Sequence, residues 1–320
     1  LTRTGGLTIV ENQSLADCSG ILRLVDQFDD AEPNPPPYRT GVPDVSAYLK
    51  IEANRTGCNS IIEIQEQLLL TEDSLTVTTI DRLFGGYGSE AGRFNRPGGI
   101  AVDAEQRILV ADSENHRIQV CDAQAACSVI GSQGQAIGQF SNPGAVSLTN
   151  DGRIVVADTA NHRVQICNYQ GECSAFGEQG TDPGQFEFPL GVAVDAEDRI
   201  IVADTGNNRI QVCDELANCD ALSGEEKGGF MGPEWVAIGP RYGIILIADT
   251  GNNRVQMCDY TGECSVFGGD RLQPDAFSEP FGIDSYGNFS FLVTDRGHGL
   301  QLCDWNENCR VLSPRGNAPG

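Results

Sequence analysis

Aspartate and arginine recur at a fixed spacing in this chain, and carboxylates are residues that can do acid–base chemistry. In four copies the Asp stands five residues before the Arg. A ring of carboxylates could act catalytically. However, a residue that recurs in every copy of a repeat usually serves the repeat itself, because an Arg fork pairs with carboxylates and loop carbonyls. We therefore predict a structural role, and no catalytic role, for Asp112/Arg117, Asp158/Arg163, Asp204/Arg209 and Asp249/Arg254.

Three histidines, His116, His162 and His298, are the candidates for a zinc site. His116 and His162 occupy a position at which two other copies carry Asn208 and Asn253. A position filled by either His or Asn is expected to lie in a turn, and no zinc-binding spacing is present. The chain also lacks a G-x-S-x-G nucleophile motif. We therefore predict no metal-ligating residue, no nucleophile and no required cofactor.

Twelve cysteines indicate disulfide chemistry. Ten of them form C-x5-C pairs, and each pair straddles a turn, so its two members face each other across neighbouring strands. A metal site is disfavoured, because the spacing is not C-x2-C and no histidine stands beside the pairs. Disulfides at this density indicate an extracellular or cell-surface protein. The expected bridges are Cys121–Cys127, Cys167–Cys173, Cys213–Cys219, Cys258–Cys264, Cys303–Cys309 and Cys18–Cys58.

The elements that position these residues repeat with a period of 45 to 46 residues, measured between the first cysteines of successive pairs. Each period opens with a Phe-x-x-Pro turn, as at 94–97, and continues with four short β-rich runs separated by turn residues. A small four-stranded sheet cannot bury both of its faces alone, so the sheets must stack around an axis. The sequence therefore predicts an all-β propeller with one blade per period.

Two of the repeated phrases carry a family resemblance. VADTGNNRIQVCD (202–214) and FEFPLGVAVD (186–195) resemble NHL repeats, and the resemblance extends over about residues 74–313. It implies a propeller that most often has six blades. It does not settle function, because NHL propellers serve as RNA binders, protein-docking platforms, extracellular sensor domains and, in the amidating lyases, zinc enzymes.

The repeats divide the chain into an arm, a propeller and a tail. Residues 1–43 read as a β-rich arm with a Pro-rich connector, and 314–320 as a C-terminal tail. Five full repeats plus a diverged first blade predict a six-bladed ring; the alternative is a five-bladed ring with 1–80 as a separate module. The arm is predicted to be an assembly device. The expected blades are 44–88 (diverged), about 92–131, 138–177, 184–223, 228–268 and 275–313.

Charge restricts the class of partner. The net charge of −24 and pI of about 4.3 argue against nucleic acid and anionic membrane surfaces, and no apolar run is long enough to span a bilayer. The excess of Asp and Glu would suit a protein that lives in salty water, where charge repulsion is screened. Calcium binding is the rival explanation of the acidity, so calcium stays open as a ligand. The chain begins with Leu1 and shows no signal-peptide pattern, so we expect a mature or excised segment. Sequons make three asparagines glycosylation candidates: Asn12, Asn54 and Asn288.

One departure from the repeat points to a binding surface. The second position after the Phe-x-x-Pro proline is Gly or Ala in four copies but Trp235 in the fourth, and Phe281 and Tyr286 add bulk in the last. These aromatics are predicted to line the axial mouth, where a ligand or partner would bind; the alternative is that Trp235 only fills space.

These observations favour an extracellular, non-enzymatic structural or protein–protein interaction module. Its partners would be proteins, including copies of itself in a larger surface or filament assembly. The alternative is a secreted propeller enzyme, either similar to the amidating lyases or a calcium-dependent hydrolase.

Overall fold

The computed structural model describes residues 48–52, 61–65, 70–71, 74–75, 82–222, 229–239, 243–268, 277–286, 290–305 and 308–313. Several predictions fall outside these residues and stay predictions. They concern the arm (1–43), the tail (314–320), the Cys18–Cys58 bridge and the sequons at Asn12, Asn54 and Asn288.

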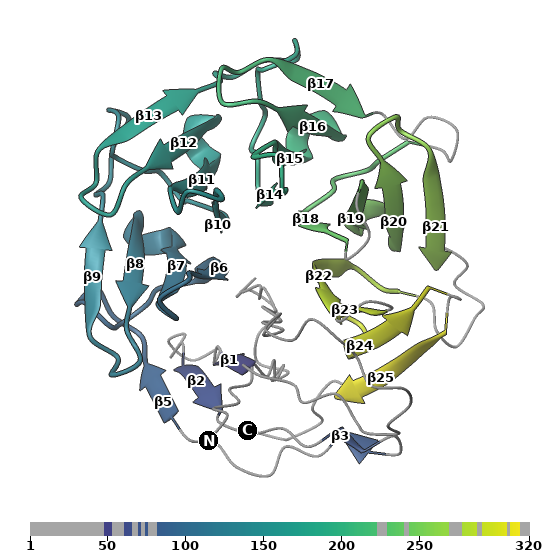
Figure 1. Ribbon diagram of the computed structural model, residues 1–320, viewed down its shortest axis with the longest axis horizontal. Coiled ribbons are helices and arrows are strands. Elements are labelled where there is room, and N and C mark those ends of the chain that lie inside the picture. Colours follow the sequence, from purple (N-terminus) through teal and green to yellow (C-terminus); the bar gives the residue numbers. More distant parts are fainter. Residues whose placement is uncertain are drawn as a thin grey trace, which may run out of the picture.

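Five four-stranded antiparallel sheets surround a central axis, and each corresponds to one sequence repeat (Figure 1). Within each sheet the strands pair in chain order, from the innermost to the outermost. The first comprises β6 (Pro97–Val102), β7 (Ile108–Asp112), β8 (Arg117–Cys121) and β9 (Cys127–Ile130); the second, β10 (Val146–Leu148), β11 (Ile154–Asp158), β12 (Arg163–Cys167) and β13 (Cys173–Phe176). The third comprises β14 (Val192–Val194), β15 (Ile200–Asp204), β16 (Arg209–Cys213) and β17 (Cys219–Leu222); the fourth, β18 (Trp235–Ile238), β19 (Ile244–Asp249), β20 (Arg254–Asp259) and β21 (Cys264–Gly268); the fifth, β22 (Pro280–Tyr286), β23 (Ser290–Asp295), β24 (Gly299–Asp304) and β25 (Cys309–Ser313).

The six-bladed expectation is not supported. The diverged segment forms a three-stranded sheet of β1 (Tyr48–Glu52), β2 (Ile61–Gln65) and β5 (Arg82–Gly85), with a small separate hairpin of β3 (Leu70–Thr71) and β4 (Ser74–Leu75). Figure 1 shows the three-stranded sheet between the β6–β9 blade and the β22–β25 blade. This segment lacks the Phe-x-x-Pro turn that opens the other blades. It also lacks the A-D-T phrase that ends their second strand. Among the described residues there are therefore five four-stranded blades.

The core lies between neighbouring blades. In β11, Ile154 and Val156 pack with the β6–β9 blade, whereas Val155 and Ala157 pack toward the following blades. Alternate residues of a strand point to opposite faces, so a strand buried on both faces becomes the continuous apolar run IVVA. Each Val, Ile or Leu buried in this way contributes roughly 1.5–3 kcal/mol. Burial between blades is therefore the main source of the ring's stability.

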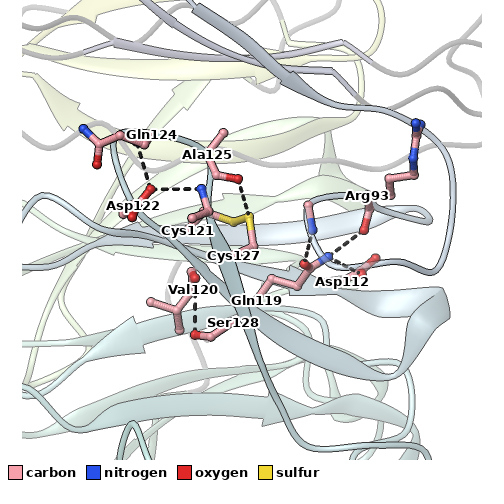
Figure 2. The surroundings of a disulfide bond; sticks show 12 residues. Arg93, Asp112, Gln119, Val120, Cys121, Asp122, Gln124, Ala125, Cys127 and Ser128 are labelled. Atoms are coloured by element: carbon pink, nitrogen blue, oxygen red, sulfur yellow. Dashed lines mark hydrogen bonds between the residues drawn. A yellow bond between two sulfur atoms is a disulfide. The ribbon is translucent and has the colours of Figure 1, made fainter.

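The five predicted repeat disulfides are confirmed. Each joins the facing residues at the ends of the two outer strands of a blade, as Cys121 faces Cys127 in the register of β8 and β9 (Figure 2). The five are Cys121–Cys127, Cys167–Cys173, Cys213–Cys219, Cys258–Cys264 and Cys303–Cys309. They indicate an oxidising environment.

Candidate functional site

The repeated Asp–Arg pairs form buried clamps inside the first four of the five blades. Asp158 has no exposed surface, and its Oδ2 accepts hydrogen bonds from Arg163 Nε at 2.7 Å and Gln165 Nε2 at 2.9 Å. Its Oδ1 accepts the backbone N–H of Ser141, in the connection from the preceding blade, at 2.7 Å. Figure 2 shows the equivalent amide of Gln119 between Asp112 and the Arg93 carbonyl. Each carboxylate therefore ties the connecting loop to the third strand, which is the structural role that the repetition predicted.

The histidines of the repeat are turn residues that link blades. His162 ends a 3-10 turn, η3 (Thr159–Asn161), in the left-handed conformation with φ 54°, and its Nδ1 accepts the Phe188 N–H of the next blade at 3.2 Å. In the following repeat, Asn208 has the same φ, and its Oδ1 accepts the N–H of Gly232 at 2.6 Å. Imidazole and amide serve as equivalent acceptors here, which explains why His and Asn interchange.

The three histidines do not converge on a metal site. His116 repeats the geometry of His162, with Nδ1 accepting the Asn142 N–H at 3.0 Å. His298 lies in the last repeat, where its Nδ1 is 3.0 Å from Asp295 Oδ1. Within the described ranges, no group of three or more His, Cys, Asp or Glu side chains is arranged to hold a metal ion.

Substitutions at His162 test this linking role. We expect His162→Asn to change the free energy of unfolding by less than about 0.5 kcal/mol, because the acceptor is kept. His162→Ala should cost about 1–3 kcal/mol, from an unpaired N–H and a strained left-handed Ala. His162→Gly separates the two effects, because Gly tolerates the conformation but offers no acceptor. Urea unfolding of the three variants measures this, and equal stability of the Asn and Ala variants would refute the linking role.

Trp235 closes the axis of the ring. It is the first residue of β18, is only 5% exposed, and reaches the opposite blade, where a Cβ on Gly99 would lie 2.5 Å from its ring. On the adjacent blade, a Cβ on Gly191 would lie 2.8 Å from the Trp235 Cα. The small residues at this position in the other repeats therefore make room for one large ring.

The other two predicted mouth aromatics lie in β22, at different ends. Phe281 is buried in the same core cluster as Trp235. Tyr286 is half-buried and is the last residue of β22, where it pairs with Ser290, the first residue of β23. The structure therefore brings Trp235 and Phe281 together and places Tyr286 near the opposite mouth.

A cavity of about 200 Å³ lies beside Trp235, on the face of the ring where the chain passes from blade to blade. Glu234 lines it, and Glu234 Oε2 accepts a hydrogen bond from Arg296 of the β22–β25 blade at 3.0 Å. Burial raises the pKa of the Glu234 carboxyl, and the attraction of Arg296 only partly opposes that effect. The lining residues are Arg96, Gly98, Ser113, Glu114, Asn142, Gly144, Thr159, Leu190, Glu234 and Trp235.

Two exposed apolar side chains lie in connections on this same face. Phe188 and Met231 are 48% and 50% exposed, and they lie in successive connections, β13 to β14 and β17 to β18. Phe188 has φ 48°, an unusual conformation for a bulky residue, and its ring packs against His162 at a centroid distance of 4.4 Å. Tyr87 and Ile137, in two other connections, are also exposed. We call the pair Phe188 and Met231 the connection-face patch.

Comparison with known families decides what the repeats are. NHL repeats match residues 94–121, 140–167 and 186–213, each running from the buried Phe of the turn to the first cysteine of a disulfide. The chain contains NHL repeats.

Two curated proteins share one stretch of these NHL repeats. "Protein brain tumor" of Drosophila melanogaster and "B-box type zinc finger protein ncl-1" of Caenorhabditis elegans are each 49% identical to this chain over 41 residues. That stretch is 13% of this chain but only 4% and 5% of the relatives. The chain therefore matches a small part of these longer proteins.

Solved structures with the same fold include both binding proteins and enzymes. A nidogen/laminin complex matches with a TM-score of 0.64 and 16% identity, covering 84% of this chain and 94% of the matched chain. Virginiamycin B lyase from Staphylococcus aureus matches at 0.54 and 13%, over 70% of this chain and 71% of the lyase. A gluconolactonase from Xanthomonas campestris matches at 0.55 and 11%, over 68% and 76%. At these identities the likeness shows the fold alone.

The NHL propeller also carries site residues that sequence reasoning missed. The repeat pattern did not single out Glu234, Arg296, Phe188 or Met231. For Phe188 a signal was present, because the residue before each repeat proline varies from copy to copy. The residues before the repeat prolines are Arg96, Asn142, Phe188, Gly232 and Glu279.

In the part of the chain that the structure describes, no helix is long and apolar enough to cross a membrane.

Proposed function

We propose that this NHL propeller is an extracellular, non-enzymatic protein-interaction module that binds its partner through the connection-face patch. The observation that carries the proposal is the pair Phe188 and Met231, two large apolar side chains about half exposed in successive connections of one face. Aromatic residues and Met are enriched at protein interfaces. The backbone N–H of Phe188 donates to His162 Nδ1 and its ring packs against the imidazole, and this ordering lowers the entropic cost of binding.

The covalent frame and the comparisons support this role. Five disulfides suit an oxidising, extracellular setting, in which the sequons at Asn12, Asn54 and Asn288 are proposed glycosylation sites. Nidogen, whose propeller resembles this one, was crystallised in complex with another protein, laminin. The partner is proposed to be a protein, with copies of this chain in a larger assembly included, and the role needs no cofactor.

Paired substitutions test the patch. Immobilised protein is incubated with the extracellular fraction of its source, and retained proteins are quantified for wild type and for Phe188→Asp/Met231→Asp. We expect a specific partner to bind the variant more than about tenfold more weakly, as for a residue pair at the centre of an interface. Leu216→Asp is the control, because Leu216 is 82% exposed in the turn between β16 and β17, on the other face. If all three proteins retain the same set, the proposal is wrong.

An enzymatic role is the second candidate, and Glu234 favours it. A carboxyl with a raised pKa in a cavity is what a general acid requires. The test is turnover of lactone and lyase substrates, with and without calcium. Turnover that Glu234→Gln abolishes would establish the enzyme and refute the non-enzymatic role.

A further inference from the structure

The cavity beside Trp235, here called the Trp235 cavity, is too small for a typical ligand site. Pockets for drug-sized ligands and cofactors measure about 300–1,000 Å³, whereas this cavity measures about 200 Å³. A single long side chain is of the right scale, and the connection-face patch lies on the same face of the ring. A side chain that a bound protein inserts is therefore the class of occupant to consider.

Glu234 sets the charge that the cavity prefers. Its side chain is only 21% exposed, and Oε2 is bonded to Arg296 Nη2. Among the described residues, no hydrogen bond reaches its other oxygen, Oε1. A partly buried carboxylate gains more from a charged donor than from a neutral one, since charge-assisted hydrogen bonds are about twice as strong as neutral ones. Burial also raises the pKa of the Glu234 carboxyl, because the attraction of Arg296 only partly compensates the cost of burying its charge.

The nearest cation of the chain, Arg296, is shared between two carboxylates, because its Nη1 also lies 3.5 Å from Glu279 Oε2, so these three side chains together keep one negative charge. Arg96 lines the cavity, but its Nη1 is 3.2 Å from Glu114 Oε1, so this pair neutralises itself. The chain as a whole carries a net charge of −24, which raises the local concentration of cationic groups.

The same propeller already binds its own arginines between an aromatic ring and a carboxylate. Arg107 lies 4.1 Å from the centroid of Tyr169 and 2.7 Å from Asp103. Arg199 lies 3.7 Å from Tyr260 and 2.6 Å from Asp195. Planar guanidinium groups suit this arrangement, because they stack on rings while their N–H groups reach a carboxylate. Trp235 and Glu234 present the same two partners to the interior of the cavity.

We propose that the Trp235 cavity binds the side chain of an arginine presented by the protein partner. The guanidinium donates to Glu234 Oε1 and lies against the indole of Trp235, and Oδ1 of Asn142, which also lines the cavity, accepts a further N–H. This inference rests on the proposed interaction function and specifies the chemistry that the partner must carry.

Free arginine and citrulline derivatives test the site without a partner. Nα-acetyl-argininamide and Nα-acetyl-citrullinamide have nearly the same shape, but only the first is charged. In a Trp305→Phe background, Trp235 is the single tryptophan of the chain, so its fluorescence reports occupancy. We expect the arginine probe to bind about tenfold more tightly than the citrulline probe. Glu234→Gln should reduce the affinity of the arginine probe to that of the citrulline probe.

Glu279→Gln is the matched control. Glu279 is the other carboxylate near Arg296, at 3.5 Å from Nη1, but it does not line the cavity. The Glu279→Gln variant loses the same charge as Glu234→Gln, but its affinity for the arginine probe should change by less than about twofold. Equal binding of the two probes to the wild type, or equal losses in the two variants, would overturn the proposal. Because the probes need no partner, probe binding with a negative Phe188→Asp/Met231→Asp experiment would refute the interaction surface and leave the cavity assignment standing.

Discussion

Reduction of the five repeat disulfides is expected to unfold the propeller under conditions in which the oxidised protein is fully folded. Each bridge closes a small loop, with its cysteines six positions apart. Chain-entropy estimates give about 2 kcal/mol for such a loop, hence about 10 kcal/mol for five. Since folded domains are stable by only about 5–15 kcal/mol, this loss is comparable to the whole free energy of unfolding.

The position of the bridges gives a second, structural reason why reduction should lower the free energy of unfolding. Each bridge fastens an outermost strand, and Figure 1 shows these strands at the circumference of the ring. In β9 only Ile130 of four residues is buried, so little apolar contact holds the strand in place. An outer edge released in this way is also free to pair with another chain.

Urea unfolding with and without a phosphine reductant, followed by tryptophan fluorescence and thiol counting, measures the effect. Removing one bridge by Cys167→Ser/Cys173→Ser should cost about 2 kcal/mol, which separates the contribution of one bridge from that of all five. A reduced protein with the same urea midpoint as the oxidised one would show that burial between blades suffices.

The sequence predicted the blades because the information that specifies a blade is local. All four strands of a blade, its turn and its disulfide lie within one period of 45–46 residues, so periodicity, strand pattern and cysteine spacing agree. The buried role of Asp158 and the turn position of His162 followed from the same repetition. The segment before Phe94 lacks these signals, and its three-stranded sheet could not be read from it.

The candidate site was less predictable because it depends on contacts across the ring. Trp235 was noticed, but its contact with Gly99 joins opposite blades. The Glu234–Arg296 pair joins residues 62 positions apart, and nothing in the repeat phrase marks either one. Likewise, the exposure of Phe188 follows from a left-handed turn that precedes a proline, which spacing alone does not reveal.

Replacing Asp158 by Ala is expected to destabilise the propeller by about 3–5 kcal/mol, the range for removing one partner of a buried ion pair. The carboxylate has no exposed surface and accepts hydrogen bonds from Ser141, Asn161, Arg163 and Gln165. Arg163 would keep its bonds to loop carbonyls but would lose Asp158, its one ion-pair partner among the described residues. The unpaired guanidinium is the largest part of the expected cost.

Asp151→Ala is the matched control, because Asp151 pairs with Arg153 in the same blade but its side chain is 58% exposed. An exposed pair of this kind should contribute less than about 1 kcal/mol. Urea unfolding of both variants decides between structural and chemical roles for the repeated carboxylates. If Asp158→Ala were as stable as Asp151→Ala, the clamp would not be needed for folding. A buried carboxylate repeated in every blade would then need another explanation, and the catalytic role set aside from the sequence would have to be reopened.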